Sequence, residues 1–156
     1  AEILKCSRNN VTDRVKSVSD ELKTTKKEID ELKKAAMGDK VGKLMSDAAV
    51  INGIRLITKE FDDLSINDLR NLSDDIKASE KNTCMVFATK SGQKVTFLVS
   101  LTDDVVEKGY HAGKMIKEIA AACGGGGGGK ADMAQAGAKD SSKIKDAFDV
   151  AQKLLS

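Results

Sequence analysis

The N-terminal part of the chain carries a repeating apolar pattern. Apolar residues recur at alternating spacings of four and three, with Thr25 as a polar interruption, at Val11, Val15, Val18, Leu22, Ile29, Leu32 and Ala36. This spacing is typical of a coiled-coil seam and predicts one long helix from about residue 8 to residue 37. Because such a narrow seam buries little surface in a lone helix, we expect a partner, either a second helix of this chain or another copy of the same helix.

A second, shorter helix is predicted from Lys43 to Ala49, after the glycines at positions 38 and 42. It would fold back along the first helix, so residues 1–49 are expected to form a coiled-coil or helical-hairpin part. We expect this part to mediate dimerisation through the seam residues Val11, Val15, Val18, Leu22, Ile29 and Leu32.

The period changes after residue 49, where β-branched residues begin to alternate with polar ones. Strands are predicted at 50–59, 84–89 and 95–101. Helices are predicted from Ser65, from Tyr110 to Cys123, and from Ser141 to the C-terminus. The expected order is α-α-β-α-β-β-α-glycine loop-α, an α+β fold in which residues 50–156 form a small sheet packed with helices.

Composition limits the classes of function. Of the 156 residues 40% are hydrophobic but only 3% aromatic, and the net charge is +2. A charge this small does not by itself indicate a nucleic-acid binder, so any polyanion site must come from local geometry. No apolar run approaches the ~20 residues of a membrane span. The chain starts at Ala1 without a methionine, and we expect it to be part of a longer protein.

Few residues are candidates for catalysis or metal binding. The three cysteines, Cys6, Cys84 and Cys123, are far apart and form no metal-binding spacing, so we expect free thiols and a reducing, cytoplasmic location. His111 is the only histidine and precedes a predicted helix, where a surface or capping role is expected. Paired acids such as Asp103-Asp104 fall at predicted helix ends, which their effect on the helix dipole explains. We therefore expect no catalytic site and no metal site.

Six consecutive glycines are the most informative feature, and they formally complete a G-x-x-x-x-G-K phosphate-loop pattern with Lys130. That pattern requires Ser or Thr next and a strand in front, whereas residue 131 is Ala and a helix is predicted before the run. Two interpretations remain open. The bare backbone could form a concave anion site near Lys114, Lys117, Lys130 and Lys139, or the glycines could allow tight packing against the sheet.

The glycine run and the segment after it, Lys-Ala-Asp-Met-Ala-Gln-Ala-Gly at residues 130–137, resemble the signature of the DHHA1 domain family, found in the C-terminal domain of alanyl-tRNA synthetases. The family form is a glycine run followed by Arg-Pro-Asp-Met-Ala-Gln-Ala-Gly-Gly. This chain departs from it at Lys130, Ala131 and Ala138. The heptad helix, the Ile51-Asn52-Gly53 segment and the segment from Lys108 to Gly113 also follow the family order.

The resemblance implies a domain that binds tRNA and dimerises through its helical part, while upstream domains, with their ATP and zinc, carry out aminoacylation and editing. The RNA contacts it suggests here are Lys114, Lys117, Gly124, Gly125, Gly126, Gly127, Gly128, Gly129, Lys130, Gln135 and Lys139. The related DHH phosphoesterases have an Asp-His-His motif that this chain lacks. Two other functions stay open: a purely structural oligomerisation module, and an accessory nucleic-acid-binding domain of a DHH-type phosphoesterase.

Overall fold

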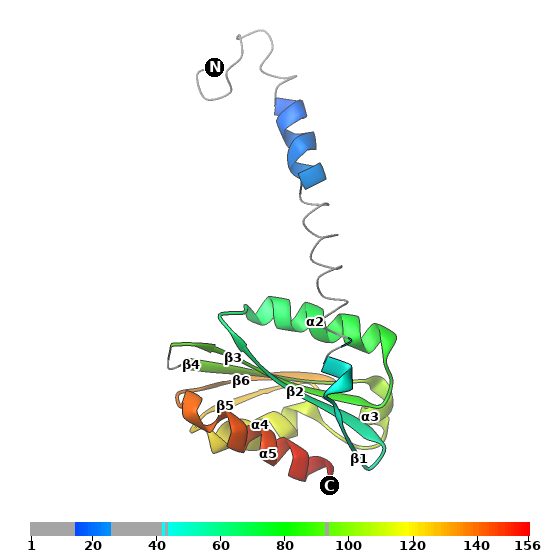
Figure 1. Cartoon of the computed structure of the whole chain (residues 1–156), viewed down its shortest axis with the longest axis vertical. Helices are drawn as coiled ribbons and strands as arrows, with labels where there is room; N and C mark the ends of the chain where they lie inside the picture. Colours follow the sequence, from blue (N-terminus) through cyan, green and yellow to red (C-terminus); the bar gives the residue numbers. More distant parts are fainter. Residues whose placement is uncertain (1–14, 26–41, 43, 93) are drawn as a thin grey trace. The chain divides into compact units, whose positions relative to one another are not determined.

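The computed structural model describes residues 15–25, 42, 44–92 and 94–156. The chain divides into two compact units, residues 1–40 and 41–156. In the first unit residues 15–25 are helical (Figure 1), within the predicted long helix. Val15 and Leu22 on this helix are 50% and 61% exposed, whereas the predicted seam positions Val11, Ile29 and Leu32 lie outside the described residues.

The second unit is built on one six-stranded sheet in the order β1-β2-β3-β4-β6-β5 (Figure 1). The strands are β1 Ala49–Ile51, β2 Ile54–Asp62, β3 Thr83–Ser91, β4 Lys94–Leu101, β5 Gly126–Gly129 and β6 Met133–Ala138. Strands β2 and β3 run parallel and are joined through a helix, while the other four pairs are antiparallel.

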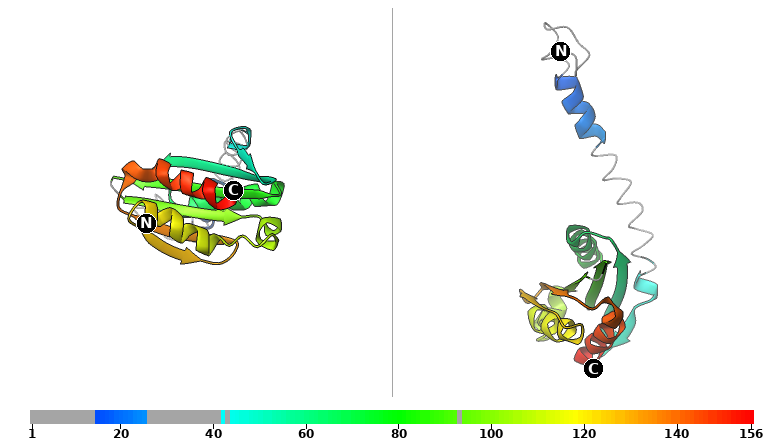
Figure 2. Two further views of the ribbon diagram at one scale, coloured as in Figure 1. Left: turned by 90° about the horizontal axis from the view of Figure 1, so that it is seen from below. Right: turned by 90° about the vertical axis from the view of Figure 1, so that its left-hand side faces the viewer.

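Helices cover the two faces of this sheet unequally. Helix α2, Ile66–Ser79, packs over β3 and β4 on one face. Helices α4, Ala112–Ala122, and α5, Ile144–Leu155, pack side by side on the other face (Figure 2). The buried residues of β3 and β4 are divided between the two faces, because successive side chains of a strand point to opposite sides of the sheet. The mixed architecture confirms the predicted α+β class. On the face that carries α2, the helix covers β3 and β4 and leaves β5 and β6 open.

Two segments differ from the prediction. The predicted strand at 50–59 is a hairpin of β1 and β2, because Asn52 and Gly53 both have positive φ angles of 50° and 75°. Such a pair is typical of a tight hairpin turn. The prediction that the glycine run is a loop is also wrong, since Gly126–Gly129 form strand β5, which pairs with β6. In the predicted short helix, residues 44–46 are helical, and Ala49 already begins β1.

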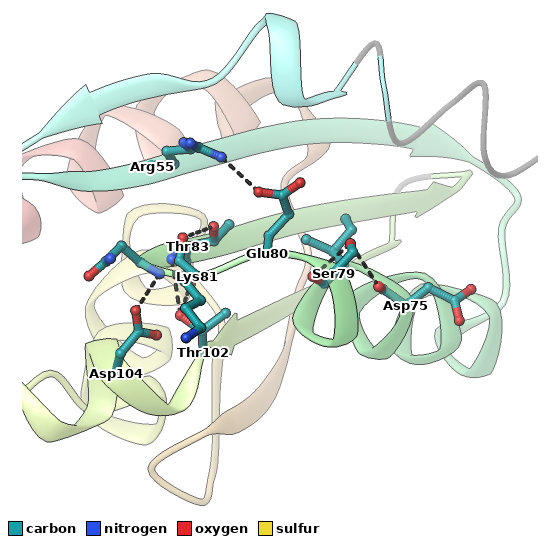
Figure 3. A network of polar contacts seen from close by, with 10 residues as sticks. Arg55, Asp75, Ser79, Glu80, Lys81, Thr83, Thr102 and Asp104 are labelled. Atoms are coloured by element: carbon teal, nitrogen blue, oxygen red, sulfur yellow. Dashed lines mark hydrogen bonds and ion pairs between the residues drawn. The ribbon is translucent and has the colours of Figure 1, made fainter.

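A polar network fixes the point where α2 leads into β3 and where β4 leads into the short helix α3, Asp103–Glu107 (Figure 3). The backbone N–H of Thr83 donates to the Thr102 hydroxyl at 3.0 Å, and the N–H of Asn82 donates to the Asp104 carboxylate at 2.5 Å. Arg55 on β2 reaches Glu80 at 2.7 Å. The first two contacts satisfy backbone N–H groups that the strand end would otherwise leave unpaired, and the third is an ion pair between side chains.

Candidate functional site

Strand β5 has glycine at every position, and alternate glycines are needed for it to pack. A Cβ atom added at Gly125, Gly127 or Gly129 would lie closer than 3.0 Å to backbone atoms of β6 or of the residues at its ends. At Gly129, for example, it would be 2.5 Å from the Ala134 Cα atom. Real Cβ atoms do not approach a backbone this closely, so the glycines allow β5 to lie against β6 as no other residue would.

The remaining hairpin glycines leave an open surface. A Cβ atom at Gly126 or Gly128 of β5, or at Gly137 of β6, would have nothing within 4 Å. In register, Gly128 lies opposite Gln135, which lies opposite Leu98, and Gly126 lies opposite Gly137. Directly opposite residues share a face of the sheet, so the three glycines lie on the face that α2 covers only in part. We call Gly126, Gly128 and Gly137 the glycine face.

Helix α4 supports the hairpin from the other side. A Cβ atom at Gly113 would be 2.6 Å from the Gly129 carbonyl oxygen, so the start of the helix touches β5 directly. The N–H groups of Ala112 and Gly113 donate to the carbonyls of Ala131 and Lys130 at 2.8 and 3.0 Å. His111 is the N-cap, and its Nδ1 atom accepts a hydrogen bond from the Gly113 N–H. The capping role expected for this histidine is confirmed.

Two cationic side chains of α2 hold the polar residues of the signature. The Arg70 guanidinium donates to Gln135 Oε1 at 2.6 Å, and the Lys77 ammonium lies 3.4 Å from the Asp132 carboxylate and 3.3 Å from the Asp132 carbonyl. Arg70 and Lys77 are seven residues apart, which is two turns of helix, so they line the same side of α2. Sequence reasoning missed both residues, because the contacts join positions that are 65 and 55 residues apart.

A hollow of about 440 Å³ lies between α2 and the hairpin. Its lining includes Arg70, Leu98, Lys130, Asp132, Met133 and Gln135, together with Gly128 of the glycine face. We call it the Arg70 hollow. A second hollow of about 420 Å³ lies at the start of α2 and is lined by Ser65, Ile66 and Lys94 among others, with Gln135 common to both. The open part of the sheet is therefore a grooved surface lined by both polar and apolar residues.

The structure separates the predicted lysines. Lys130 directly follows β5, whereas Lys139 directly follows β6 at the opposite end of that strand. Six residues of strand put them roughly 20 Å apart along the hairpin. Lys114 and Lys117 are exposed on α4, the helix that covers the face opposite α2. The expectation that these four cations gather around one concavity is thus wrong. Lys130, Gln135 and Gly128 are the predicted residues that the Arg70 hollow brings together.

The described cysteines are free and buried. Burial raises the pKa of the Cys84 thiol to about 12. Burial, and then the charges of Asp140 and Asp146, also raise the pKa of Cys123. A thiol must ionise to act as a nucleophile, so neither is activated at neutral pH. Within the residues that the structure describes, no cluster of three or more His, Cys, Asp or Glu is suited to a metal ion. None of the helices described there is long and apolar enough to cross a membrane.

Comparisons with known proteins agree on one family. The DHHA1 domain model matches residues 53–156. Alanine–tRNA ligase of Acetivibrio thermocellus is 40% identical over 155 residues, covering 99% of this chain and 18% of that protein. The enzyme of Alkaliphilus metalliredigens is 38% identical over 153 residues, covering 98% of this chain and 17% of that protein. The chain thus spans less than a fifth of the length of these relatives.

Solved structures show the same fold. The C-Ala domain of Aquifex aeolicus alanyl-tRNA synthetase is 28% identical with a TM-score of 0.67, and the match covers 70% of this chain and 98% of that domain. A DHH-domain protein, described as a member of a family of ribosomal proteins, is 19% identical with a TM-score of 0.53, covering 79% of this chain and 31% of that one. The second likeness concerns the fold alone.

Proposed function

Because the chain belongs to the DHHA1 domain family, we propose that it is the C-terminal domain of an alanine–tRNA ligase and binds tRNA for that enzyme. The alignment with such ligases over 99% of the chain supports this assignment. Aminoacylation and editing, with their ATP and zinc, are assigned to other domains of the enzyme. The domain's role is to hold tRNA where those domains act on it.

The observation that carries the RNA-binding proposal is the glycine face with its cationic border. A surface without side chains lets a phosphodiester backbone or a base approach the peptide groups closely, and Arg70 and Lys130 stand beside it. Protein contacts to phosphate come mostly from Arg, Lys and backbone N–H groups. Recognition by backbone and shape also fits a chain with only 3% aromatic residues for stacking.

The proposal includes the predicted lysines of the hairpin and of α4 as phosphate contacts. With the net charge of only +2, affinity must come from a few placed cations rather than from a general positive field. Lys130 is adjacent to the glycine face, and Lys114, Lys117 and Lys139 extend the contact around the sheet edge. The weak fold likeness to a DHH domain does not favour an accessory role in a phosphoesterase.

The test is a tRNA gel shift at low and moderate salt. The double variant Lys117→Ala/Lys130→Ala is expected to weaken binding about tenfold. It is also expected to make the slope of log K against the logarithm of salt concentration shallower by the amount that corresponds to about two phosphate contacts. The matched control is Lys145→Ala/Lys153→Ala, which removes the same charge from exposed positions on α5. If both double variants give the same affinity and the same salt slope, the assignment of these contacts is wrong.

A further inference from the structure

The turn between β1 and β2 consists of an asparagine followed by a glycine, Asn52-Gly53. Both residues have positive φ angles, a conformation that Asn and Gly adopt more readily than other residues. Asn52 is exposed, and a Cβ atom at Gly53 would have nothing within 4 Å. The side-chain amide of Asn52 is therefore followed directly by a backbone nitrogen that no side chain of its own residue shields.

The Asn52 side chain is also attached to the end of helix α5. Its amide nitrogen donates to the Leu155 carbonyl at 2.8 Å and to the Ser156 carbonyl at 2.9 Å. An amide NH₂ group has two hydrogens to donate, and these two contacts use both. The last four carbonyls of a helix have no partner within the helix, so the turn supplies partners that the end of α5 lacks.

An Asn-Gly pair can lose ammonia without an enzyme. The glycine backbone nitrogen attacks the side-chain amide carbon of the asparagine and forms a new C–N bond, and glycine, which lacks a Cβ atom, obstructs this attack least. The amide nitrogen leaves as ammonia and takes up the proton that the glycine nitrogen gives up. Water then opens the resulting succinimide ring at one of its two carbonyls, which leaves aspartate or isoaspartate. The only co-reactant is water, and nothing is oxidised or reduced.

We propose that Asn52 is a deamidation site and that the last turn of α5 controls its modification. The nitrogen that must leave is the atom that makes both hydrogen bonds to the helix end. These bonds restrict the rotation of the side chain and hold the leaving group, so the docked helix opposes the reaction. Helix ends fray and open locally, and each such opening releases the Asn52 amide. The inference is independent of RNA binding.

The product does not fit the position that asparagine occupies. A carboxylate can only accept hydrogen bonds. In an aspartate at this position, an oxygen would face the two carbonyl oxygens to which the amide nitrogen of Asn52 now donates. Isoaspartate would also add a carbon atom to the backbone of a two-residue turn. Deamidation therefore makes the release of the last turn of α5 permanent, whereas fraying alone is reversible.

The first experiment measures deamidation of the full chain in mildly alkaline buffer, by mass spectrometry of the peptide that contains Asn52. Lys153→Gly weakens the last turn of α5 at an exposed position, and Lys145→Gly makes the same change in the first turn. We expect Asn52 to deamidate about fivefold faster in the Lys153→Gly variant than in the Lys145→Gly variant. Equal rates in the two variants would overturn the control by α5. An Asn52 that stays intact even when guanidinium chloride unfolds the chain would overturn the site itself.

The second experiment measures the consequence for the helix. Asn52→Asp reproduces the aspartate product, and hydrogen exchange compares the amides in the last turn of α5 with those in its first turn. We expect about tenfold faster exchange in the last turn and no change in the first, because two hydrogen bonds to the helix end are lost. Asn71→Asp makes the same chemical change at an exposed position on α2 and should leave α5 unchanged. If the two variants exchange alike in α5, the proposed release of the helix end is wrong.

Discussion

At the scale of single residues, five of the six glycines, Gly125 to Gly129, have two different roles that alternate along the chain. Gly125, Gly127 and Gly129 allow β5 to lie against β6, whereas Gly126 and Gly128 leave the opposite surface bare. Close packing and ligand access were two competing interpretations of the glycine run in the sequence. In the structure the packing role belongs to one set of glycines, and the other set is available to a ligand.

This alternation predicts that alanine substitutions at neighbouring glycines have different effects on stability, so that one variant serves as the control for the other. Gly127→Ala places a Cβ atom against the Ala136 Cα atom and the Gln135 carbonyl, and we expect a loss of about 1–3 kcal/mol in the free energy of unfolding, as for overpacking. Gly126→Ala has open space and should be neutral or stabilising by up to about 1 kcal/mol, because alanine restricts the unfolded chain. Urea unfolding measures both, and equal midpoints for the two variants would contradict the alternation.

At the scale of elements, the start of α3 depends on one carboxylate. Burial by itself raises the pKa of Asp104, but hydrogen bonds from the Thr102 hydroxyl and from the backbone N–H groups of Asn82, Asp104 and Val105 lower it, and the net pKa lies below the usual value. Asp104 thereby joins α3 to the start of β3 (Figure 3).

A pH dependence follows from the direction of this shift. A carboxyl whose pKa is lower in the folded state stabilises the fold above its unfolded pKa of about 3.9, and loses that contribution as the pH falls through the folded pKa. We therefore expect Asp104→Asn to be less stable than the unmodified protein near pH 7 and the difference to shrink below about pH 4. Asp149→Asn, at an exposed position on α5, controls for the loss of one carboxylate. A difference for Asp104→Asn that stays constant with pH in urea unfolding would contradict the role of this carboxylate.

At the scale of the whole molecule, the helix at 15–25 is proposed to make the protein a dimer. Val15 and Leu22, seven residues apart, are 50% and 61% exposed on it, and Val18 lies between them, as a coiled-coil seam requires. Under the two proposals together, RNA binding belongs to the globular unit and association to the helix. A purely structural oligomerisation module would have the second property alone.

Sedimentation equilibrium tests the association. Val15→Glu/Leu22→Glu places two charges in the predicted seam and is expected to shift a dimer to monomer at micromolar concentration, because a charge at a seam position must be desolvated on pairing. Ser17→Glu/Thr24→Glu adds the same two charges to exposed polar positions of the same helix and should remain a dimer. A monomer for the unmodified protein would remove the dimer proposal without affecting the RNA-binding one.

Local patterns in the chain were enough to identify most elements of the globular unit. Periods of two and of 3.6 residues arise from local backbone geometry, so the strands around Phe87 and Phe97 and the helices with Leu72, Ile116 and Phe148 were predictable from nearby residues. The signature at 124–137 likewise indicated the family, because it is a contiguous run of residues. The helix predicted from Ser65 is also observed, with the Ser65 hydroxyl capping α2 by accepting from the Asp68 N–H.

Tertiary packing, in contrast, makes the glycine run a strand and determines which of its glycines face open space. A run without side chains has no hydrophobic period, and β5 exists because β6 and α4 pack against it. The same holds for the Arg70 hollow, because its Arg70–Gln135 contact joins positions 65 residues apart. The division of the lysines between two faces also depends on which helix covers which side of the sheet. Such long-range juxtapositions are set by packing, and no local pattern in the chain encodes them.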